Sequence, residues 1–383
     1  MTEEYGTQLM LEAYTGQGGE WPWSPEEWER RAQAALPAGP WWYIQGAAGS
    51  GSTMRANADA FPRWRLRPRV LTGNSERDLS LEVLGMRSPL PFALAPVGVQ
   101  SIAHPDGELA VARAARSSGV PMLLSTYSSH SIEEVASELG DTPRWFQLYW
   151  LSNREITESL VRRAEATGYE AIVVTVDTLR LGWREADLAN GYLPFLQGEG
   201  IANLTTDPVF RALVGDAADD RAVAGFHAVS TFTNLALTWS DFAWLRSITR
   251  LPILAKGVLT AEAARQAVDA GCAAVIVSNH GGRQVDGAVA ALDALVEVRE
   301  ALPELPLIFD SGLRRAADVL KARALGADLT LIGRPYMYGL AVGGQAGVER
   351  VIRVLAADLD VTLSLIGAHS VRELDRTWVE RAP

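Results

Sequence analysis

Residues 274–284 read Ala-Val-Ile-Val-Ser-Asn-His-Gly-Gly-Arg-Gln, a short apolar run that ends in polar residues and glycines. Such a run is typical of a buried strand in a parallel sheet, and seven similar runs alternate with longer segments of helical periodicity. Eight strand-helix units in one chain predict an α/β fold, a TIM (β/α)8 barrel, in preference to an open doubly wound sheet. The predicted strands are Phe92–Ala95, Met122–Ser125, Trp145–Tyr149, Ala171–Val176, Ile253–Lys256, Ala274–Ser278, Leu307–Asp310 and Leu329–Gly333.

Helices and two less regular regions complete the predicted single domain of residues 1–383. Residues 1–65 are Trp-rich and are predicted to form an N-terminal helical extension, in which Ser24 and Pro25 mark a helix start. Residues 178–250, after the fourth strand, are far longer than one βα connection and are predicted to form a lid. The helices predicted between the strands are Gly107–Ser118, Ser131–Leu139, Arg154–Thr167, Ala261–Ala270, Leu292–Ala301 and Ala316–Leu325.

Composition excludes several classes of protein. The formal charge is −11, from 46 acidic and 35 basic residues, which opposes binding to nucleic acid or anionic lipid. Cys272 is the single cysteine, so no internal disulfide can form. No stretch reaches the ~20 apolar residues of a membrane span, and the acidic start Met1–Tyr5 is unlike a signal peptide. We therefore expect a cytoplasmic protein without a membrane association.

The ends of the last two strands predict a phosphate site. In a barrel, functional residues gather where the strands end, and phosphates commonly bind after strands seven and eight. Gly312 with Arg314, and Gly333 with Arg334, combine accessible backbone amides with bidentate cations. Either pair alone is better explained as a structural turn with a solvated arginine. Both pairs on consecutive strands favour phosphate.

His280 and Arg283 share one glycine-rich turn after strand six. A catalytic base needs a pKa near the working pH and a carboxylate that orients its ring, and Asp177 at the end of strand four is the candidate partner. Arg184 could join Arg283 in binding a substrate carboxylate. An alternative is that Arg184 lies on a helix surface and pairs with Glu185 or Asp187.

Lys256 ends an apolar strand, so its ammonium group emerges from the barrel wall. Such a lysine acts either as a Schiff-base nucleophile or as a fixed cation beside a cofactor, and the phosphate site favours the second role. No metal site is predicted, because Cys272 is isolated and no two histidines have ligand spacing.

Three motifs together resemble the FMN-dependent 2-hydroxy-acid oxidases. They are Ser278-Asn279-His280-Gly281-Gly282-Arg283-Gln284, Asp310-Ser311-Gly312-Leu313-Arg314 and Gly333-Arg334-Pro335, and the resemblance extends from about Trp41 to Leu374. It implies bound FMN, a small 2-hydroxy acid and O2 as substrates, and a homo-oligomer, a tetramer or an octamer. It further implies that His280 is the base, that Asp177 orients it, and that flavin N5 receives the α-hydrogen.

The resemblance also implies roles for further residues. The implied substrate-binding residues are Tyr43, Tyr127, Tyr149, Arg184 and Arg283, and Tyr149 is implied to be catalytic as well. The implied cofactor-binding residues are Ala95, Pro96, Val97, Gly98, Ser125, Gln147, Thr175, Lys256, Ser278, Asp310, Gly312, Arg314, Gly333 and Arg334.

Two positions bear on the product. Val97-Gly98 resembles the pattern of lactate 2-monooxygenases, which convert lactate and O2 into acetate, CO2 and water, whereas Tyr127 is closer to lactate oxidase. We expect oxidative decarboxylation if the lid retains the keto acid, with Gly98 leaving room beside the flavin. Release of the keto acid and H2O2 is the alternative.

Two other functions are less favoured. A membrane-associated dehydrogenase of the same family would need an insertion that suits anionic lipid, but residues 195–238 hold five acids and two arginines, a net charge of −3. A catalytically silent flavin-binding protein would have a damaged base or clamp, yet His280, Arg283, Arg184 and Tyr43 are all present.

Overall fold

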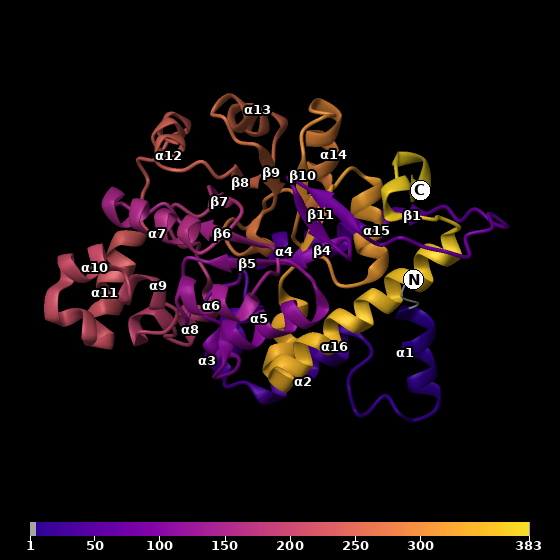
Figure 1. Cartoon of the computed structure of the whole chain (residues 1–383), viewed down its shortest axis with the longest axis horizontal. Helices are drawn as coiled ribbons and strands as arrows, with labels where there is room; N and C mark the ends of the chain where they lie inside the picture. The colour runs from indigo at the N-terminus through magenta and orange to yellow at the C-terminus, as the bar shows by residue number, and fades with distance from the viewer. Residues whose placement is uncertain (1–4, 383) are drawn as a thin grey trace.

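The computed structural model of the chain describes residues 5–382. Eight parallel strands close into a barrel, in which each strand pairs with the next and the last pairs with the first (Figure 1). The predicted barrel is confirmed, and each strand end differs from its prediction by at most two residues. The strands are β4 (Phe92–Leu94), β5 (Met122–Ser125), β6 (Arg144–Leu148), β7 (Ile172–Thr175), β8 (Ile253–Val258), β9 (Ala274–Val277), β10 (Leu307–Phe309) and β11 (Leu329–Ile332).

An outer helix follows every barrel strand. Six of these helices were predicted, and their bounds agree within a few residues. The long α16 was not predicted; it bends at Gly343 and Gly344, whose backbone angles are not helical. The outer helices are α5 (Gly107–Ser118), α6 (Ile132–Leu139), α7 (Arg154–Ala166), α12 (Phe242–Ile248), α13 (Ala261–Asp269), α14 (Ala291–Ala301), α15 (Ala316–Ala324) and α16 (Arg334–Ile366).

The predicted lid at 178–250 needs a correction at its end, because α12 lies in the outer helix layer as the partner of β7. Phe242 and Leu245 of α12 are buried, and the Phe242 ring packs against Trp150. Seven residues are too few for a clear helical period in the sequence. The remainder is an insertion of short helices that extends to one side of the barrel in Figure 1. Its helices are α8 (Glu185–Ala189), α9 (Ala202–Thr205), α10 (Pro208–Val214) and α11 (Arg221–Phe232).

A hairpin of β2 (Leu81–Val83) and β3 (Met86–Ser88) fills the end of the barrel where the strands begin. Its two-residue turn, Leu84-Gly85, has positive φ at both positions, as tight hairpins require. Leu81, Val83 and Met86 pack into one buried cluster with the side chains of the barrel interior. Within the barrel, a large cavity can therefore form only at the opposite end, where the strands finish.

The N-terminal extension is helical, as predicted, and wraps against α16. Ser24 caps α2 by accepting a hydrogen bond from the Glu27 amide at 3.2 Å. After the helices, β1 (Trp64–Leu66) pairs antiparallel with β12 (Val379–Arg381) from the other end of the chain. None of the helices formed by residues 5–382 is both long and apolar enough to cross a membrane. The helices of the extension are α1 (Tyr5–Tyr14), α2 (Pro25–Ala35), α3 (Ala38–Gln45) and α4 (Ser52–Ala60).

Candidate active site

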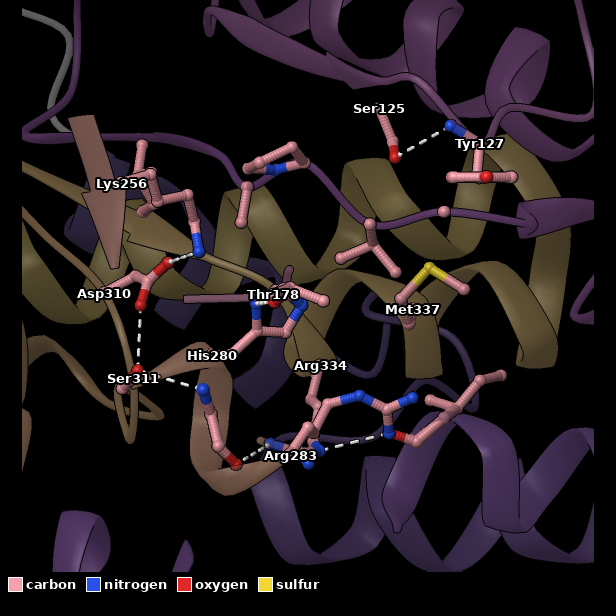
Figure 2. Close-up of a pocket in the computed structure, with 18 of the residues that line it drawn as sticks. Ser125, Tyr127, Thr178, Lys256, His280, Arg283, Asp310, Ser311, Arg334 and Met337 are labelled. Atoms are coloured by element: carbon pink, nitrogen blue, oxygen red, sulfur yellow. Dashed lines mark hydrogen bonds and ion pairs between the residues drawn. The ribbon is translucent and has the colours of Figure 1, made fainter. Parts of the chain in front are cut away.

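A cavity of about 1120 Å³ opens at the end of the barrel where the strands finish (Figure 2). Most of the residues predicted from the sequence line it, and the other four lie directly behind its wall. The predicted residues that line the cavity are Tyr43, Ala95, Pro96, Val97, Gly98, Ser125, Tyr127, Tyr149, Arg184, Lys256, His280, Arg283, Asp310, Gly312, Arg314, Gly333 and Arg334. Those behind it are Gln147, Thr175, Asp177 and Ser278.

His280 projects into the cavity from a tight turn after β9. Its backbone is left-handed (φ 58°), and the hydroxyl of Ser278 fixes it by accepting a hydrogen bond from the His280 amide at 3.0 Å. Nδ1 of the ring lies 3.1 Å from Oδ1 of Asp177 and 3.1 Å from the Thr178 hydroxyl. Nε2 faces the cavity and lies 3.5 Å from the Tyr149 hydroxyl. Asp177 and Thr178 thus fix the orientation of the ring at Nδ1, and Nε2 remains accessible from the cavity.

Electrostatics favour a neutral imidazole beside an ionised carboxylate. Burial lowers the pKa of His280 and outweighs the opposite effect of Asp177. Burial raises the pKa of Asp177, but the charges of His280 and Lys256 outweigh it and hold that pKa below its usual value. A neutral imidazole held by a carboxylate can accept a proton near neutral pH.

Two arginines lie side by side at the mouth of the cavity. Arg184 donates to the Arg283 carbonyl (3.2 Å) and to Oε1 of Gln284 (3.1 Å), and the Arg283 guanidinium lies over the Tyr43 ring at 5.2 Å. The nearest carboxylate, Asp187, is 3.9 Å from Arg184, so the predicted alternative pairing exists only as a long contact. Burial, with the Arg184 charge, lowers the pKa of Arg283 to about 9. Two buried cations with so little compensation favour an incoming anion.

The two predicted Gly-Arg pairs lie in the same cavity, and Arg334 lies beside Arg283, because both guanidinium groups donate to the Gly46 carbonyl, at 2.9 and 3.0 Å. Gly312 has a left-handed backbone (φ 92°), and a methyl group there would lie 2.9 Å from the Asn57 carbonyl, so this turn requires glycine. Arg334 donates only to backbone carbonyls, among them those of Ile44 and Gly46, and burial lowers its pKa to about 10. No carboxylate within residues 5–382 forms an ion pair with Arg314 or Arg334.

Lys256 lines the cavity from β8, in the barrel wall. Its Nζ lies 3.2 Å from Asp310 and 3.1 Å from the Ser278 hydroxyl (Figure 2). Burial lowers its pKa, but the carboxylates of Asp310 and Asp177 outweigh burial and raise it. Lys256 is therefore a permanently charged cation rather than a neutral amine.

Three aromatic rings close the cavity above His280. The Tyr127 ring packs against Phe195 with ring centroids 4.5 Å apart and an interplanar angle of 48°, and the Phe232 ring centroid lies 5.6 Å from that of Tyr127. The Tyr127 hydroxyl donates to the Ala228 carbonyl at 3.1 Å, so it points into α11 and only its ring is available to a substrate. We call Tyr127, Phe195 and Phe232 the aromatic roof.

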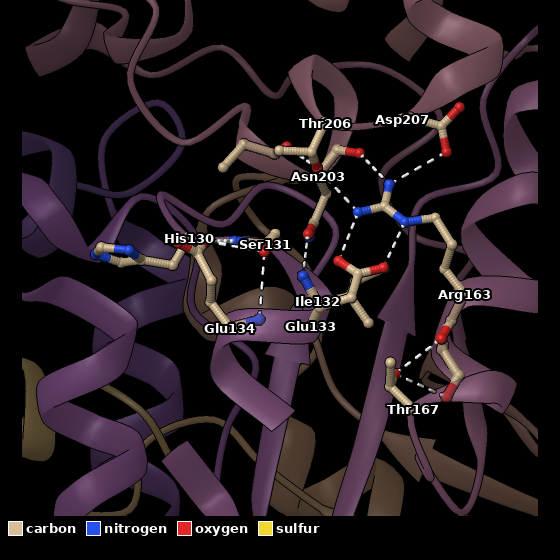
Figure 3. A network of polar contacts seen from close by, with 12 residues as sticks. His130, Ser131, Ile132, Glu133, Glu134, Arg163, Thr167, Asn203, Thr206 and Asp207 are labelled. Atoms are coloured by element: carbon tan, nitrogen blue, oxygen red, sulfur yellow. Dashed lines mark hydrogen bonds and ion pairs between the residues drawn. The ribbon is translucent and has the colours of Figure 1, made fainter. Parts of the chain in front are cut away.

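Asn203 is one of the points at which the insertion is fixed to the barrel. Asn203, fully buried in α9, donates to the carbonyls of Ser125 and Thr126 and accepts from the Ile132 amide. Arg163 of α7 binds Asp207 and Glu133 beside it (Figure 3). The contacts of Asn203 thus divide the predicted lid into two loops, one before and one after this residue.

The structure gives a reason for glycine at position 98 that differs from the expected one, which was room beside the flavin. A methyl group added there would lie 2.8 Å from the Tyr127 carbonyl oxygen and 3.4 Å from the Ser125 hydroxyl. It would collide with the backbone that follows β5, so Gly98 allows two chain segments to approach each other closely.

Several residues of the site were not predicted. Thr178 directly follows Asp177 at the end of β7, so the rule that strand ends carry function could have found it. Phe195 and Phe232 lie in the insertion, where nothing in the sequence distinguishes them from core residues. The remaining unpredicted residues of the cavity wall are Ile44, Leu181, Gly281, Ser311, Leu313, Leu331 and Met337.

The sequence model of the FMN-dependent dehydrogenase family matches residues 32–381. The L-lactate oxidase of Lysinibacillus sphaericus (strain C3-41) is 41% identical over 375 residues, covering 98% of this chain and 96% of that protein. The 2-hydroxyacid oxidase 1 of Homo sapiens is 40% identical over 360 residues, covering 93% and 96% respectively.

The fold is also similar to that of solved structures. A crystal structure of mandelate oxidase with (S)-4-hydroxymandelic acid superposes with a TM-score of 0.84 at 40% sequence identity. The similarity covers 94% of this chain and 99% of that one. Both the sequence and the structure are thus similar to flavoenzymes over nearly their full length.

Proposed function

Because the chain belongs to the family of FMN-dependent dehydrogenases and oxidises a 2-hydroxy acid with FMN, we propose that its substrate is a small L-2-hydroxy acid, L-lactate first, with O2 as acceptor. The observation that carries this proposal is the arrangement of His280, held by Asp177 at 3.1 Å, opposite the buried pair Arg184 and Arg283. A base and a carboxylate clamp in one cavity suit a molecule that carries a hydroxyl next to a carboxylate.

The residues of the cavity fit FMN. Arg314 and Arg334 are cations without carboxylate partners among residues 5–382, beside the backbone of Gly312 and Gly333, which suits a phosphate. A methyl group built at Gly333 would meet only carbon atoms at 3.7 Å, so this wall leaves space. Lys256 would face the ring system as a fixed positive charge. Bound FMN would supply a two-electron acceptor that O2 can reoxidise.

The protein's own groups would prepare the substrate for oxidation. Arg184, Arg283 and the Tyr43 hydroxyl would hold the carboxylate, which fixes the hydroxyl within reach of Nε2 of His280. His280 would accept the hydroxyl proton at Nε2, and Asp177 would stabilise the resulting imidazolium through Nδ1. Tyr149, whose hydroxyl lies 3.5 Å from Nε2, would hydrogen-bond the same substrate oxygen.

The chemistry of the aromatic roof favours a substrate with an apolar side chain. Tyr127, Phe195 and Phe232 offer rings and no free charge to the group attached to the reacting carbon. A methyl group or an aryl group suits such a wall, and a charged side chain does not. Anaerobic bleaching of the flavin by L-lactate, glycolate and L-mandelate, compared by their rate constants, tests this proposal. Absence of bleaching by every 2-hydroxy acid would indicate a silent flavin-binding protein instead.

We further propose that the keto acid is retained and decarboxylated, so that lactate and O2 yield acetate, CO2 and water. The support is the closed aromatic roof, tied to the barrel by Asn203 and through the Tyr127 hydroxyl to α11. Acetate should then form in a ratio near one per O2 in the wild-type protein. Pyruvate and H2O2 in that ratio would instead identify a simple oxidase.

The roof itself can be tested with a matched pair of variants. Phe195→Ala should open the roof and shift the products from acetate toward pyruvate and H2O2. Phe226→Ala removes an exposed ring of the same insertion and should leave the ratio unchanged. Equal ratios in wild type and Phe195→Ala would contradict retention by the roof.

We also propose that the protein acts as a single-domain, cytoplasmic homo-oligomer, on the basis of its composition and family. Light scattering of the FMN-loaded protein measures the assembly directly, and a monomeric mass would contradict it.

A further inference from the structure

Val99, directly after the proposed flavin-contacting segment Ala95–Gly98, has a left-handed backbone (φ 59°, ψ 48°). A β-branched residue rarely adopts this conformation, because its Cβ crowds the neighbouring peptide. Such strain persists only where surrounding contacts enforce it, and it is concentrated at functional sites. The contacts that enforce this turn therefore indicate what the segment depends on.

Three different elements hold the turn. The Val99 amide donates to the Tyr127 carbonyl after β5 at 2.8 Å, and the next amide, that of Gln100, donates to Oε1 of Glu108 in α5 at 3.0 Å. On the insertion side, Gly200 packs so closely that a methyl group there would lie 2.5 Å from Cγ2 of Val99. Glu108 is the one side chain among these contacts that holds the turn by a hydrogen bond.

Gln100 extends the connection to the proposed cofactor segment. Its Nε2 donates to the Val97 carbonyl at 3.0 Å and lies 3.3 Å from the Tyr336 hydroxyl. That hydroxyl donates in turn to the Ala95 carbonyl at 2.8 Å. Glu108, Gln100 and Tyr336 are all buried, so the wall behind Ala95–Gly98 is a polar network closed to solvent.

The position of Glu108 is hard to explain by stability alone. Its side chain is fully buried, its Oε2 forms no hydrogen bond within residues 5–382, and it takes part in no ion pair there. A buried carboxyl with an unsatisfied oxygen opposes folding, whereas an apolar residue at this place would not. Its favourable effect is concentrated on the bond to the Gln100 amide.

We propose that Glu108 is a positioning residue of the flavin site, which sets the place of Ala95–Gly98 against bound FMN by fixing the turn at Val99. This inference rests on the proposed placement of FMN against that segment. Glu108 contacts neither the cavity nor the carboxylate clamp, so its effect belongs to cofactor binding and not to substrate binding.

The test is the FMN dissociation constant of the apoprotein, measured by flavin fluorescence. Glu108→Ala should weaken FMN binding about tenfold, as expected for the loss of a buried hydrogen bond to a charged or polar partner. Glu108→Gln should stay within about threefold of wild type, because the amide oxygen can still accept from Gln100. In the FMN-saturated enzyme, the KM for L-lactate should change by less than about twofold in both variants, since the clamp is untouched.

Glu134→Ala is a matched control. Glu134 also lies in the first turn of a helix and accepts a backbone hydrogen bond, from Ser131 at 2.8 Å, but it forms no hydrogen bond to the turn at Val99. It should leave FMN binding unchanged. If Glu134→Ala weakens FMN as much as Glu108→Ala, or if Glu108→Ala binds FMN normally, Glu108 has no positioning role.

Two further variants separate the ways in which this inference could fail. Arg314→Ala should weaken FMN through the phosphate; if it does so while Glu108→Ala does not, the cofactor placement stands and the role of Glu108 is wrong. If neither variant affects FMN, the placement itself is wrong. Should Glu108→Ala not fold, Tyr336→Phe, which removes the donor to the Ala95 carbonyl, must weaken FMN at least about threefold, or the network has no part in binding.

Discussion

Oδ1 of Asp177 and the hydroxyl of Thr178 both lie 3.1 Å from Nδ1 of His280, and Thr178 itself donates to Asp177 at 2.7 Å. Two consecutive residues at the end of β7 thus hold one ring from behind. The arrangement fixes the orientation of the imidazole and leaves Nε2 free toward the cavity. The first two predictions depend on this contact.

His280→Gln should retain FMN but reduce the rate of flavin bleaching by L-lactate at least about a hundredfold, because general-base catalysis is worth that much. Stopped-flow absorbance under anaerobic conditions measures the rate. His369→Gln alters an exposed histidine and serves as the control. Bleaching at the wild-type rate in the His280 variant would assign the base elsewhere.

The pH dependence should follow the lowered pKa of His280. The base must be neutral, so kcat/KM should fall only when the pH drops below the ordinary histidine value of 6.5. Asp177→Asn removes a carboxylate that raises the pKa of His280, so the acid limb should move to still lower pH while the plateau falls about a hundredfold or more. An acid limb above pH 6.5 in wild type would contradict the neutral, desolvated imidazole.

Arg283→Lys should raise the KM for L-lactate about tenfold or more, because an ammonium group cannot reproduce the planar two-point contact with a carboxylate. The loss should be smaller for an uncharged 2-hydroxy amide. Arg180→Lys changes an exposed arginine of the insertion and should have no effect. An unchanged KM would place the clamp on other residues.

Gly98→Ala should destabilise the protein by about 1–3 kcal/mol, since the added methyl must displace the Tyr127 carbonyl. Thermal unfolding of the apoprotein measures this cost. In variant protein that is fully loaded with FMN, the ratio of acetate to pyruvate should stay as in wild type. A changed ratio without loss of stability would restore the original expectation that Gly98 leaves room beside the flavin.

Glu108→Gln should change the dependence of stability on pH. Burial raises the pKa of Glu108 from 4.5 to about 7, so the folded protein holds this proton more tightly than the unfolded chain. The free energy of unfolding should therefore fall by about 3 kcal/mol as the pH rises from about 4.5 to about 7, and the glutamine variant should lack that part of the decline. Urea titrations of the apoproteins at several pH values test the difference; parallel curves would contradict it.

The fold could be predicted from the sequence because each barrel strand is a short apolar run bounded by polar or turn residues. The same regularity predicts that His280, Lys256, Arg314 and Arg334 lie at one end of the barrel, because each follows or ends a strand. The family resemblance supplied the roles of Tyr43 and Tyr149, whose own surroundings in the sequence are unremarkable, and it favoured the clamp for Arg184, which the residues alone had left open between two roles.

What could not be predicted depends on contacts between residues far apart in the chain. Phe195 and Phe232 form a roof only because α11, which ends at Phe232, packs against the helical turn that carries Phe195. Asn203 is an anchor only because it reaches the carbonyls of Ser125 and Thr126. Tyr127 was expected to bind the substrate, but the sequence could not show that its hydroxyl donates to the Ala228 carbonyl. No local pattern carries such information.

The pairing of β1 with β12 has a consequence for biosynthesis. Trp64 pairs with Arg381, and the barrel itself closes only when β11 reaches β4, so each closure waits until its C-terminal strand has been synthesised. Until then the nascent chain carries β4 as an open edge, which is prone to pair with other chains. Stalled or truncated chains that end before Leu329 should therefore need chaperones for longer than chains that contain β11.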